Sequence, residues 1–416
     1  MRYVTDLHIH SRFSRACSKE LTLENIDRVC AQKGVGIVAT GDYTHPQWFK
    51  EMKNTLIEQE PGLYVVRGSQ TKTRFVCSVE ISCIYSKGGK VRRLHIVVLA
   101  PSLEVVEKIN RELSKIGNLA ADGRPILGLD AKKLSEIVLN VDKNCFVIPA
   151  HVWTPWFAIF GSKSGFDSIQ ECYEELTPTI HALETGLSSD PPMNWRLSRL
   201  DNVVLVSHSD AHSLPNLARE ANVFEIDPAR LRYQEICDVI TRGDERFLYT
   251  LEFYPDEGIY HWDGHRDCNF SCPPAETKKL NGLCPVCQRP LTIGVEYRTD
   301  QLADRPMGYT PDHPIGYRKL VELDKIIAES LNIKSRASKA VQAEYQRLLR
   351  FGKTELELLL DTSLEELAAL TSARIVEGIR RVRAGKLVIH PGYDGKYGEI
   401  HIFTDHEKAR LQPSLF

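Results

Sequence analysis

Short apolar runs rich in β-branched residues alternate with helical patterns over about the first 255 residues of the chain. Residues 3–9 and 35–40 have the pattern of strands, and residues 21–34 between them have that of a helix capped by Thr22 and ended by Gly34. This alternation predicts an α/β fold with enough units for a closed parallel barrel, although periodicity alone also allows a three-layer sandwich. Further strand candidates lie within residues 64–82, 91–100, 145–151, 180–185, 203–212, 222–226 and 246–254.

A chain of 416 residues is too long for one ordinary hydrophobic core, so several domains are expected. Its 42% hydrophobic and 26% charged residues are typical of a soluble globular protein. The expected parts are a barrel over residues 1–255, a small cysteine-containing domain over 256–312, a helical, basic region with a Gly-rich hairpin over 313–405, and a flexible tail over 406–416.

The sequence also indicates a compartment. No apolar run approaches the ~20 residues of a membrane span, and the start of the chain lacks a secretory signal pattern. Eleven cysteines, an odd number and mostly scattered, favour free thiols in a reducing cytoplasm over a disulfide framework. The net charge of −2 shows no global preference for nucleic acid, so any basic surface must be local.

Histidines and acids recur at or near the ends of the expected strands. His8 and His10 are two apart, so in a strand both side chains point to the same face. Any one of these residues is as well explained as a polar loop residue, but the whole set predicts metal ligation at the rim where barrel strands end. The others are Asp42, His45, Glu80, His95, His151, Asp210 and His212.

Imidazole and carboxylate ligands suit Zn, Mn or Fe, and the set is large enough for two or three ions. Clustered cations favour hydrolysis of phosphate esters, because one activates a water and the others hold the oxygens of the phosphate. The predicted catalytic residues are therefore the ligands themselves, and no side-chain nucleophile is needed.

The stretches DLHIH, TGD, VEIS, PAH and SDAH, in this order, resemble the polymerase-and-histidinol-phosphatase (PHP) domain, a distorted (βα)7 barrel with a trinuclear metal centre. The resemblance implies that Glu80 bridges two ions. The chain departs from the family pattern at Thr40–Asp42, where T-D-H is usual. Binding of the third ion is therefore left open, and His45 is an alternative ligand for it. The implied sets are His8, His10, Glu80 and Asp210 for one ion, Glu80, His95 and His151 for the second, and Asp42 and His212 for the third.

A second metal pattern follows the barrel. Cys284 and Cys287 form a CPVC knuckle, with His265, Cys268 and Cys272 upstream. This spacing is typical of a zinc ribbon holding one structural Zn, with a redox-active thiol pair as the weaker alternative. Spacing leaves the fourth ligand open between His265 and Cys272.

Basic residues gather in the helical region after residue 320. A basic helix face is usually solvated surface, but helix N-termini and Arg side chains also suit contacts to DNA phosphates. At the chain end, Gln412, Leu415 and Phe416 fit the Q-x-x-L-F pattern of peptides that bind DNA sliding clamps, a short pattern that also arises by chance. The candidate DNA-binding residues are Lys334, Arg336, Lys339, Arg374, Arg380 and Arg381.

A PHP barrel, a CPVC ribbon, LADRP, a basic helical region and PGYDGKYG together resemble the endonuclease Q family over essentially the whole chain. The resemblance implies a repair endonuclease that cuts DNA on the 5′ side of uracil, hypoxanthine, xanthine or an abasic site and leaves 3′-hydroxyl and 5′-phosphate ends. It also implies a clamp partner and a cytoplasmic, nucleoid-associated location.

A nuclease of this kind must extrude the damaged nucleotide and hold it beside the metals. Aromatic residues near the strand ends are candidates for such a base pocket, although core packing explains each one as well. They are Tyr43, Trp48, Trp153 and Trp156. Two alternative functions are a PHP phosphoesterase of small phosphate monoesters and a non-catalytic, clamp-tethered DNA-binding protein.

Overall fold

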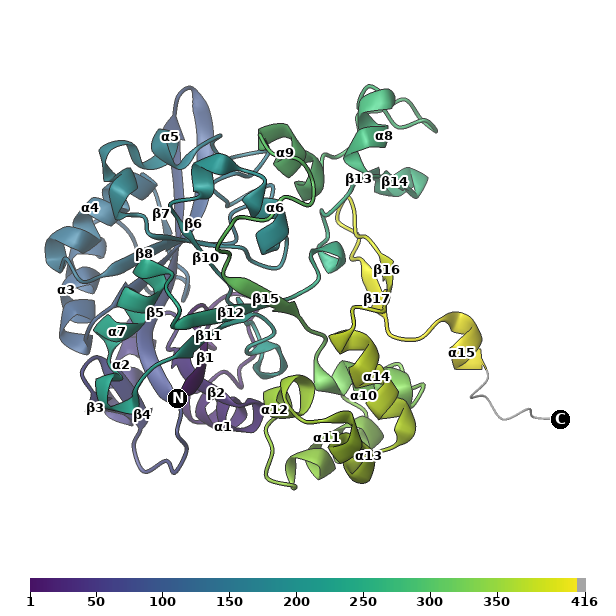
Figure 1. Ribbon diagram of the computed structural model, residues 1–416. Helices are drawn as coiled ribbons and strands as arrows, with labels where there is room; N and C mark the ends of the chain where they lie inside the picture. The colour runs from purple at the N-terminus through teal and green to yellow at the C-terminus, as the bar shows by residue number, and fades with distance from the viewer. Residues whose placement is uncertain (410–416) are drawn as a thin grey trace.

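The computed structural model describes residues 1–409, and the expected α/β fold is confirmed (Figure 1). Backbone pairing connects the strands β1, β2, β5, β6 and β8 in that spatial order. Their bounds are β1 Arg2–Asp6, β2 Val35–Ala39, β3 Leu56–Glu60, β4 Leu63–Val66, β5 Arg74–Lys87, β6 Lys90–Ala100, β7 Ile126–Leu127, β8 Phe146–Pro149, β9 Ala182–Glu184, β10 Val204–Val206, β11 Ala221–Glu225 and β12 Phe247–Glu252.

The connections continue beyond β8 and return to the first strand. Val152, just after β8, donates its N–H to the carbonyl of Glu184 at 3.0 Å, and β9 pairs in parallel with β10. After β10, the carbonyl of Ala211 accepts from the N–H of His10 at 3.1 Å. The ends of these strands therefore lie around one region of the fold.

Some connections differ from the expected βα alternation, because β3 and β4 form one antiparallel hairpin and β5 and β6 form another. β5 and β6 form an antiparallel hairpin joined by Gly88 and Gly89, both in the left-handed region with φ of 62° and 71°. Two glycines with positive φ suit the tight turns that match strand twist. β6 consequently runs antiparallel to both β5 and β8.

The helices pack around this sheet. The predicted helix between β1 and β2 is present as α1, where the Thr22 side chain accepts from the N–H of Asn25 and Gly34 is left-handed with φ of 89°. The other helices of this part are α2 Pro46–Thr55, α3 Leu103–Leu113, α4 Ala131–Val141, α5 Ile169–Tyr173, α6 Pro191–Trp195 and α7 Tyr233–Arg242, with α1 spanning Leu23–Lys33.

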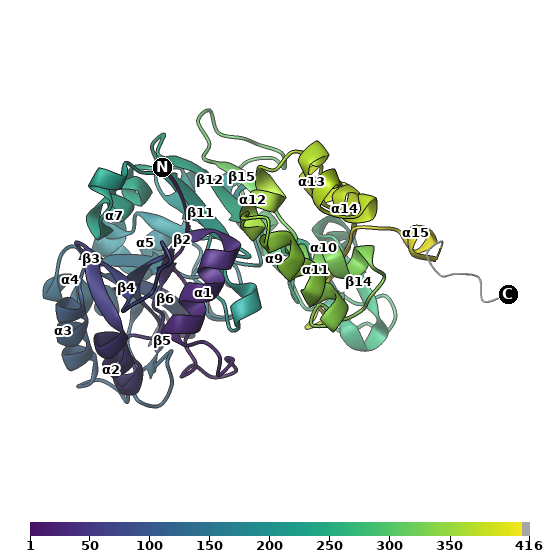
Figure 2. The same ribbon diagram turned by 90° about the horizontal axis from the view of Figure 1, so that it is seen from below.

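Two smaller parts lie on one side of this body (Figures 1 and 2). The first holds the hairpin β13 Asp263–His265 and β14 Phe270–Cys272 with α8 Pro274–Lys279, whereas α9 Val295–Leu302 packs on the main body beside α6. The second is helical and has its own apolar core. Its elements are α10 Leu323–Ser330, α11 Lys339–Leu349, α12 Glu355–Leu360, α13 Leu364–Leu370, α14 Ala373–Arg383, β16 Val388–His390, β17 Glu399–His401 and α15 Asp405–Ala409.

Specific contacts join the parts. β15 (Gly316–Lys319) pairs in parallel with β12, so the segment after the cysteines extends the main sheet. Figures 1 and 2 place α12 beside α1, where the ammonium of Lys33 lies 3.7 Å from a carboxylate oxygen of Glu355. The expected Gly-rich hairpin is present as β16 and β17. Its loop contacts the cysteine-containing part, since Asp394 accepts from the N–H of Arg266 at 2.7 Å.

Side-chain caps begin two helices of the helical part. Ser363 accepts from the N–H of Glu366, as its position suggests. The reciprocal capping box lies one helix earlier, where Thr354 and Glu357 satisfy each other's backbone N–H groups. Within residues 1–409, no helix combines the length and apolarity needed to cross a bilayer.

Candidate metal centre

The first cluster of candidate ligands joins the end of β1 to β5 and to the segment after β10. One donor atom from each of its residues lies within 4.8 Å of the others. The Nε2 atom of His8 lies 3.6 Å from carboxylate oxygens of both Glu80 and Asp210, yet it is buried without a hydrogen-bond partner. An orphaned imidazole nitrogen among carboxylates fits a divalent cation. The cluster comprises His8, His10, Glu80 and Asp210.

The second cluster shares Glu80 with the first. His95 lies opposite Ser82 in the β5–β6 pair, so it shares the face of Glu80 two residues away. The Oε1 atom of Glu80 lies 2.7 Å from Nδ1 of His95 and 3.1 Å from Nε2 of His151. Its Oε2 atom faces Nε2 of His10 at 3.3 Å. Oε1 of Glu80 also lies 3.6 Å from Nε2 of His8, so the carboxylate contacts both clusters, which suits a bridging ligand.

Outer contacts set the direction of the imidazoles. Nδ1 of His8 lies 2.9 Å from an oxygen of Glu184, and Nδ1 of His10 lies 3.0 Å from Oδ1 of Asp42. All four side chains are fully buried. A carboxylate on one ring nitrogen fixes the tautomer and leaves the other nitrogen for a metal. Asp42 and Glu184 therefore orient His10 and His8.

Electrostatics keep the carboxylates ionised. Burial raises the pKa of Asp210, but the hydrogen bond with His10 and the charge of His8 hold it below its ordinary value. Burial likewise opposes ionisation of Glu80, yet the neighbouring imidazoles and Arg124 place its pKa well below the usual range. Burial lowers the pKa of His8, but nearby carboxylates, Glu184 foremost, raise it well above its ordinary value. A divalent cation would replace such protons.

Backbone conformation is unusual at these strand ends. Asp42, His151 and Asp210 all have positive φ, at 49°, 30° and 44°. Non-glycine residues adopt this region at a cost of about 1–3 kcal/mol, and such residues are enriched at functional sites. The surrounding strands hold these three side chains in place.

The residues expected for a third ion are not gathered into a third cluster within residues 1–409. Asp42 is saturated, since its Oδ2 accepts from the N–H and hydroxyl of Ser11. His45 stacks on the ring of Phe13 with centroids 4.4 Å apart. His212 donates from Nδ1 to the carbonyl of Asp210 at 2.8 Å and is partly exposed.

The aromatic candidates for a base pocket need correction. Tyr43, Trp48 and Trp153 are fully buried in the main hydrophobic core. The indole N–H groups of Trp48 and Trp153 donate to the carbonyl of Gly41 and the side chain of Asn194, so both point inward. Trp156 is the exception, because it is partly exposed and packs edge to face with Tyr260 at 5.5 Å.

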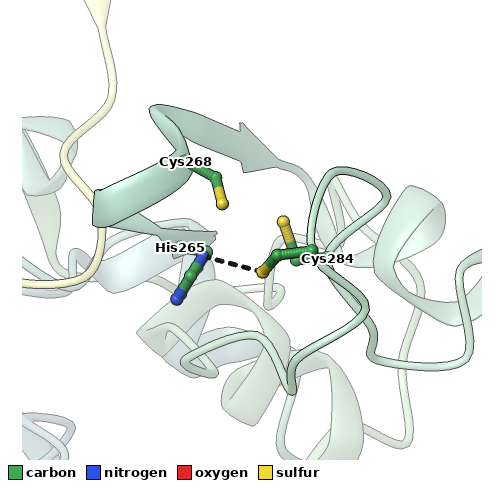
Figure 3. A group of neighbouring side chains, drawn as sticks. His265, Cys268 and Cys284 are labelled. Carbon is green, nitrogen blue, oxygen red and sulfur yellow. Dashed lines mark hydrogen bonds between the residues drawn. The ribbon is translucent and has the colours of Figure 1, made fainter.

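The ribbon residues form a separate cluster (Figure 3). His265 comes from the end of β13, and its Nδ1 lies 3.4 Å from Sγ of Cys287. Cys272 is not a member, since its thiol is buried against the hydroxyl of Thr277 at 3.3 Å. The geometry therefore favours His265 over Cys272 as the fourth ligand. The cluster is His265, Cys268, Cys284 and Cys287.

The six basic candidates in the helical part fall into two types, arginines that contact neighbouring side chains and exposed lysines. Arg336 is held by Glu322 and Asp324, and Arg381 by Glu377 and Glu407, so these pairs stabilise the fold. Arg380 pairs with Glu377, and Arg374 lies 4.0 Å from the ring centre of Phe403. Lys334 and Lys339 are exposed. Residues Gln412, Leu415 and Phe416 lie outside the described residues.

Sequence reasoning did not single out two residues of the centre. Glu184 ends β9, so its place at a strand end was an available signal. Arg124 lies in the loop before β7, and its guanidinium donates to Oε2 of Glu80 at 3.0 Å. No periodic pattern marks that loop.

Comparisons with known sequences match different parts of the chain. The model of the MJ0043 C-terminal domain matches residues 322–386. The uncharacterized protein MJ0043 of Methanocaldococcus jannaschii is 30% identical over 262 residues, and the chain spans only 31% of that protein. The uncharacterized protein YqxK of Bacillus subtilis is 26% identical, and the match covers 95% of this chain and 98% of that protein.

Two solved structures match the whole chain. The lesion-specific endonuclease PfuEndoQ from Pyrococcus furiosus has a TM-score of 0.85 and 28% identity, with 100% of both chains covered. Endonuclease Q in complex with a 27-mer duplex bearing an abasic lesion at its active site has a TM-score of 0.84 and 30% identity, with 99% of both chains covered.

Proposed function

The chain belongs to the endonuclease Q family, and we propose that it is a metal-dependent DNA endonuclease that cuts on the 5′ side of deaminated bases and abasic sites. The observation that carries this proposal is the full-length similarity to a structure holding an abasic duplex, combined with two ligand clusters that share Glu80. The first part would be a PHP-type barrel, and the products would carry 3′-hydroxyl and 5′-phosphate ends.

The chemistry at the clusters suits phosphodiester hydrolysis. Divalent cations such as Zn, Mn or Fe supply activation of water and neutralisation of phosphate charge when bound there. The chain's own contribution is to fix the ligands. Asp42 and Glu184 hold the Nε2 atoms of His10 and His8 toward the carboxylates, and burial of both clusters keeps the local dielectric low.

The other parts would bind DNA. A structural Zn on the ribbon ligands would stabilise the small β13–β14 fold, which has few apolar residues of its own. Lys334 and Lys339 are exposed and would contact phosphates without reading bases. The tail at Gln412, Leu415 and Phe416 would bind a sliding clamp, in a cytoplasmic, nucleoid-associated protein.

Lesion recognition requires the target nucleotide to leave the stack, which costs a few kcal/mol and is easiest for a mismatched or missing base. Uracil, hypoxanthine and xanthine are the proposed base lesions. Trp156 and Tyr260 are partly exposed aromatic residues that would stack on a displaced nucleotide.

End-labelled duplexes carrying uracil, hypoxanthine or an abasic site test the proposal. We expect one cut on the 5′ side of each lesion, none in undamaged duplex, and complete loss with a chelator or with Asp210→Ala. Cutting of damaged and undamaged duplex at equal rates would contradict lesion specificity. Release of phosphate from a small monoester without any nicking would instead support a phosphoesterase.

A further inference from the structure

Arg124 is in direct contact with the carboxylate that bridges the two clusters. Its Nη1 atom lies 3.0 Å from Oε2 of Glu80, and about a quarter of its side chain remains exposed. Within residues 1–409, it is the one Lys or Arg that pairs with a candidate ligand carboxylate. A cation therefore lies at the centre with one side buried and one side open to solvent.

The loop that carries Arg124 is fixed on both sides of it. Gly123 donates its N–H to the carbonyl of Phe13 at 3.0 Å, and the carbonyl of Pro125 accepts from the N–H of Ser82 on β5 at 3.0 Å. At Gly123 a Cβ atom would collide with the carboxylate of Asp42, so the backbone packs directly on the outer contact of His10. Such bracing is typical of groups that must be placed accurately.

Within residues 1–409, the side chains near Arg124 do not form a ligand cluster for a third metal ion. The Oδ1 atom of Asp42 faces Nδ1 of His10, and its Oδ2 accepts from the side chains of Ser11 and Ser14. An oxygen so fully occupied is a poor metal ligand. His212 is likewise turned to the carbonyl of Asp210. In the part of the chain that the structure covers, Arg124 is the positive charge beside the two clusters.

Charge balance points to an anion at the open side of Arg124. Two divalent cations would neutralise the buried carboxylates, and the guanidinium would then leave a surplus positive charge. A phosphodiester carries one negative charge, and a guanidinium presents paired donors that match two phosphate oxygens. The carboxylates are Asp42, Glu80 and Glu184, which are fully buried, and Asp210, which is about one-fifth exposed.

We propose that Arg124 is a catalytic residue that binds the non-bridging oxygens of the scissile phosphate, on the side of the centre where a third ion was expected. This inference rests on the proposed function. Arg124 holds the phosphate against the two clusters and stabilises the charge that grows on its oxygens as the strand is cut. The contact to Glu80 aims the guanidinium and leaves its remaining donors for the substrate.

A purely structural role makes a different prediction. If Arg124 serves only to hold Glu80, its removal should loosen the bridging ligand and release metal from the barrel. If it binds phosphate, its removal should leave the metal content unchanged and weaken anion binding. Metal content and phosphate affinity therefore separate the two roles without any measurement of cutting.

The test compares the wild type with Arg124→Ala, Arg124→Lys and Arg12→Ala, all as the full metal-loaded chain. Arg12 is a matched control, because it is a surface arginine near the same rim that pairs only with Glu51. We expect unchanged metal content in all four proteins by elemental analysis. Calorimetry with inorganic phosphate should show an affinity reduced about tenfold or more in Arg124→Ala and unchanged in Arg12→Ala.

On a duplex with an abasic site, kcat/KM should fall on the order of 100- to 1,000-fold in Arg124→Ala, with part of the loss recovered in Arg124→Lys. Unchanged phosphate affinity in Arg124→Ala, loss of barrel metal in that variant, or no phosphate binding by the wild type would overturn the inference. A wild type that binds phosphate through Arg124 but cuts no damaged duplex would refute the proposed function alone.

Discussion

Glu184 and His8 form a fully buried pair in which Nδ1 of the imidazole lies 2.9 Å from one carboxylate oxygen and 3.1 Å from the other. Glu184 belongs to neither ligand cluster. Its contribution is to fix the ring of His8, so the free Nε2 atom faces Glu80 and Asp210.

This pair predicts a defect in metal affinity for Glu184→Ala. The outer partners of ligating histidines typically contribute 10- to 100-fold to metal affinity, so we expect a loss of about that size at the cluster that contains His8. Competition with a chromophoric chelator measures it. Glu184→Gln retains one acceptor for the imidazole and should lose less. Equal metal affinity in wild type and Glu184→Ala would show that the strands alone orient His8.

The ribbon offers a comparison between two cysteines. Cys284→Ser should remove one equivalent of zinc and lower the melting temperature of the chain, because Cys284 belongs to the four-residue cluster. Cys272→Ser should keep the zinc, since the thiol of Cys272 contacts Thr277 instead. Elemental analysis measures the zinc content, and differential scanning calorimetry measures the melting temperature. Loss of zinc in Cys272→Ser would assign that thiol as a ligand in place of His265.

The two clusters that share Glu80 predict which histidines are needed to hold metal. His151→Ala should lose metal from these clusters, because the Nε2 atom of His151 lies 3.1 Å from the carboxylate of Glu80. His212→Ala should keep the metal content of the wild type, because His212 lies in neither cluster. Both variants remove one partly or fully buried imidazole, so each controls for the other. A stoichiometric loss of one ion in His212→Ala would show that a third ion binds.

A buried acid pair beside the centre predicts a dependence of stability on pH. Burial raises the pKa of Glu252 to about 8, and burial together with the charge of Glu252 raises the pKa of Glu220 well above its ordinary value. One oxygen of each carboxyl group lacks a partner. The folded chain therefore holds protons that the unfolded chain has released.

Because the folded-state pKa of Glu252 exceeds its unfolded value, its contribution to stability is complete at acid pH and is lost as the pH rises toward 8. Glu252→Gln cannot ionise, so its melting temperature should exceed that of the wild type at pH 8.5 and approach it at pH 5.5. Thermal melts of both proteins across this range provide the measurement. A constant difference between them at every pH would contradict the raised pKa.

Much of the metal centre was readable from the sequence because strand ends in an α/β fold meet at one rim. His8, His10, His151 and Asp210 follow strand ends and are gathered as their positions suggested, whereas Glu80 and His95 join them from within β5 and β6. Glu184 has the same kind of position, but a lone acid at a strand end carries no spacing pattern. Arg124 lies in an irregular loop, where no periodicity applies.

The direction of side chains that follow the strands was the other property that the sequence did not predict. Tyr43, Trp48 and Trp153 follow strand ends, as a base pocket requires, but their rings turn into the core. The hydrophobic gain from burying a large aromatic ring outweighs its place in the sequence. Gly88 and Gly89 lie between the expected strands at residues 64–82 and 91–100 and make the tight turn that joins β5 and β6 as a hairpin in place of a βα unit.

The left-handed backbone at Asp42, His151 and Asp210 bears on whether folding or metal binding comes first. Isolated segments of chain would relax from such conformations, so these residues reach their final geometry only when the strands on either side have docked. The first cluster spans residues 8 to 210, about half of the polypeptide. We therefore expect cations to be captured late, by an already assembled sheet, and in a refolding experiment metal uptake should lag behind the recovery of secondary structure.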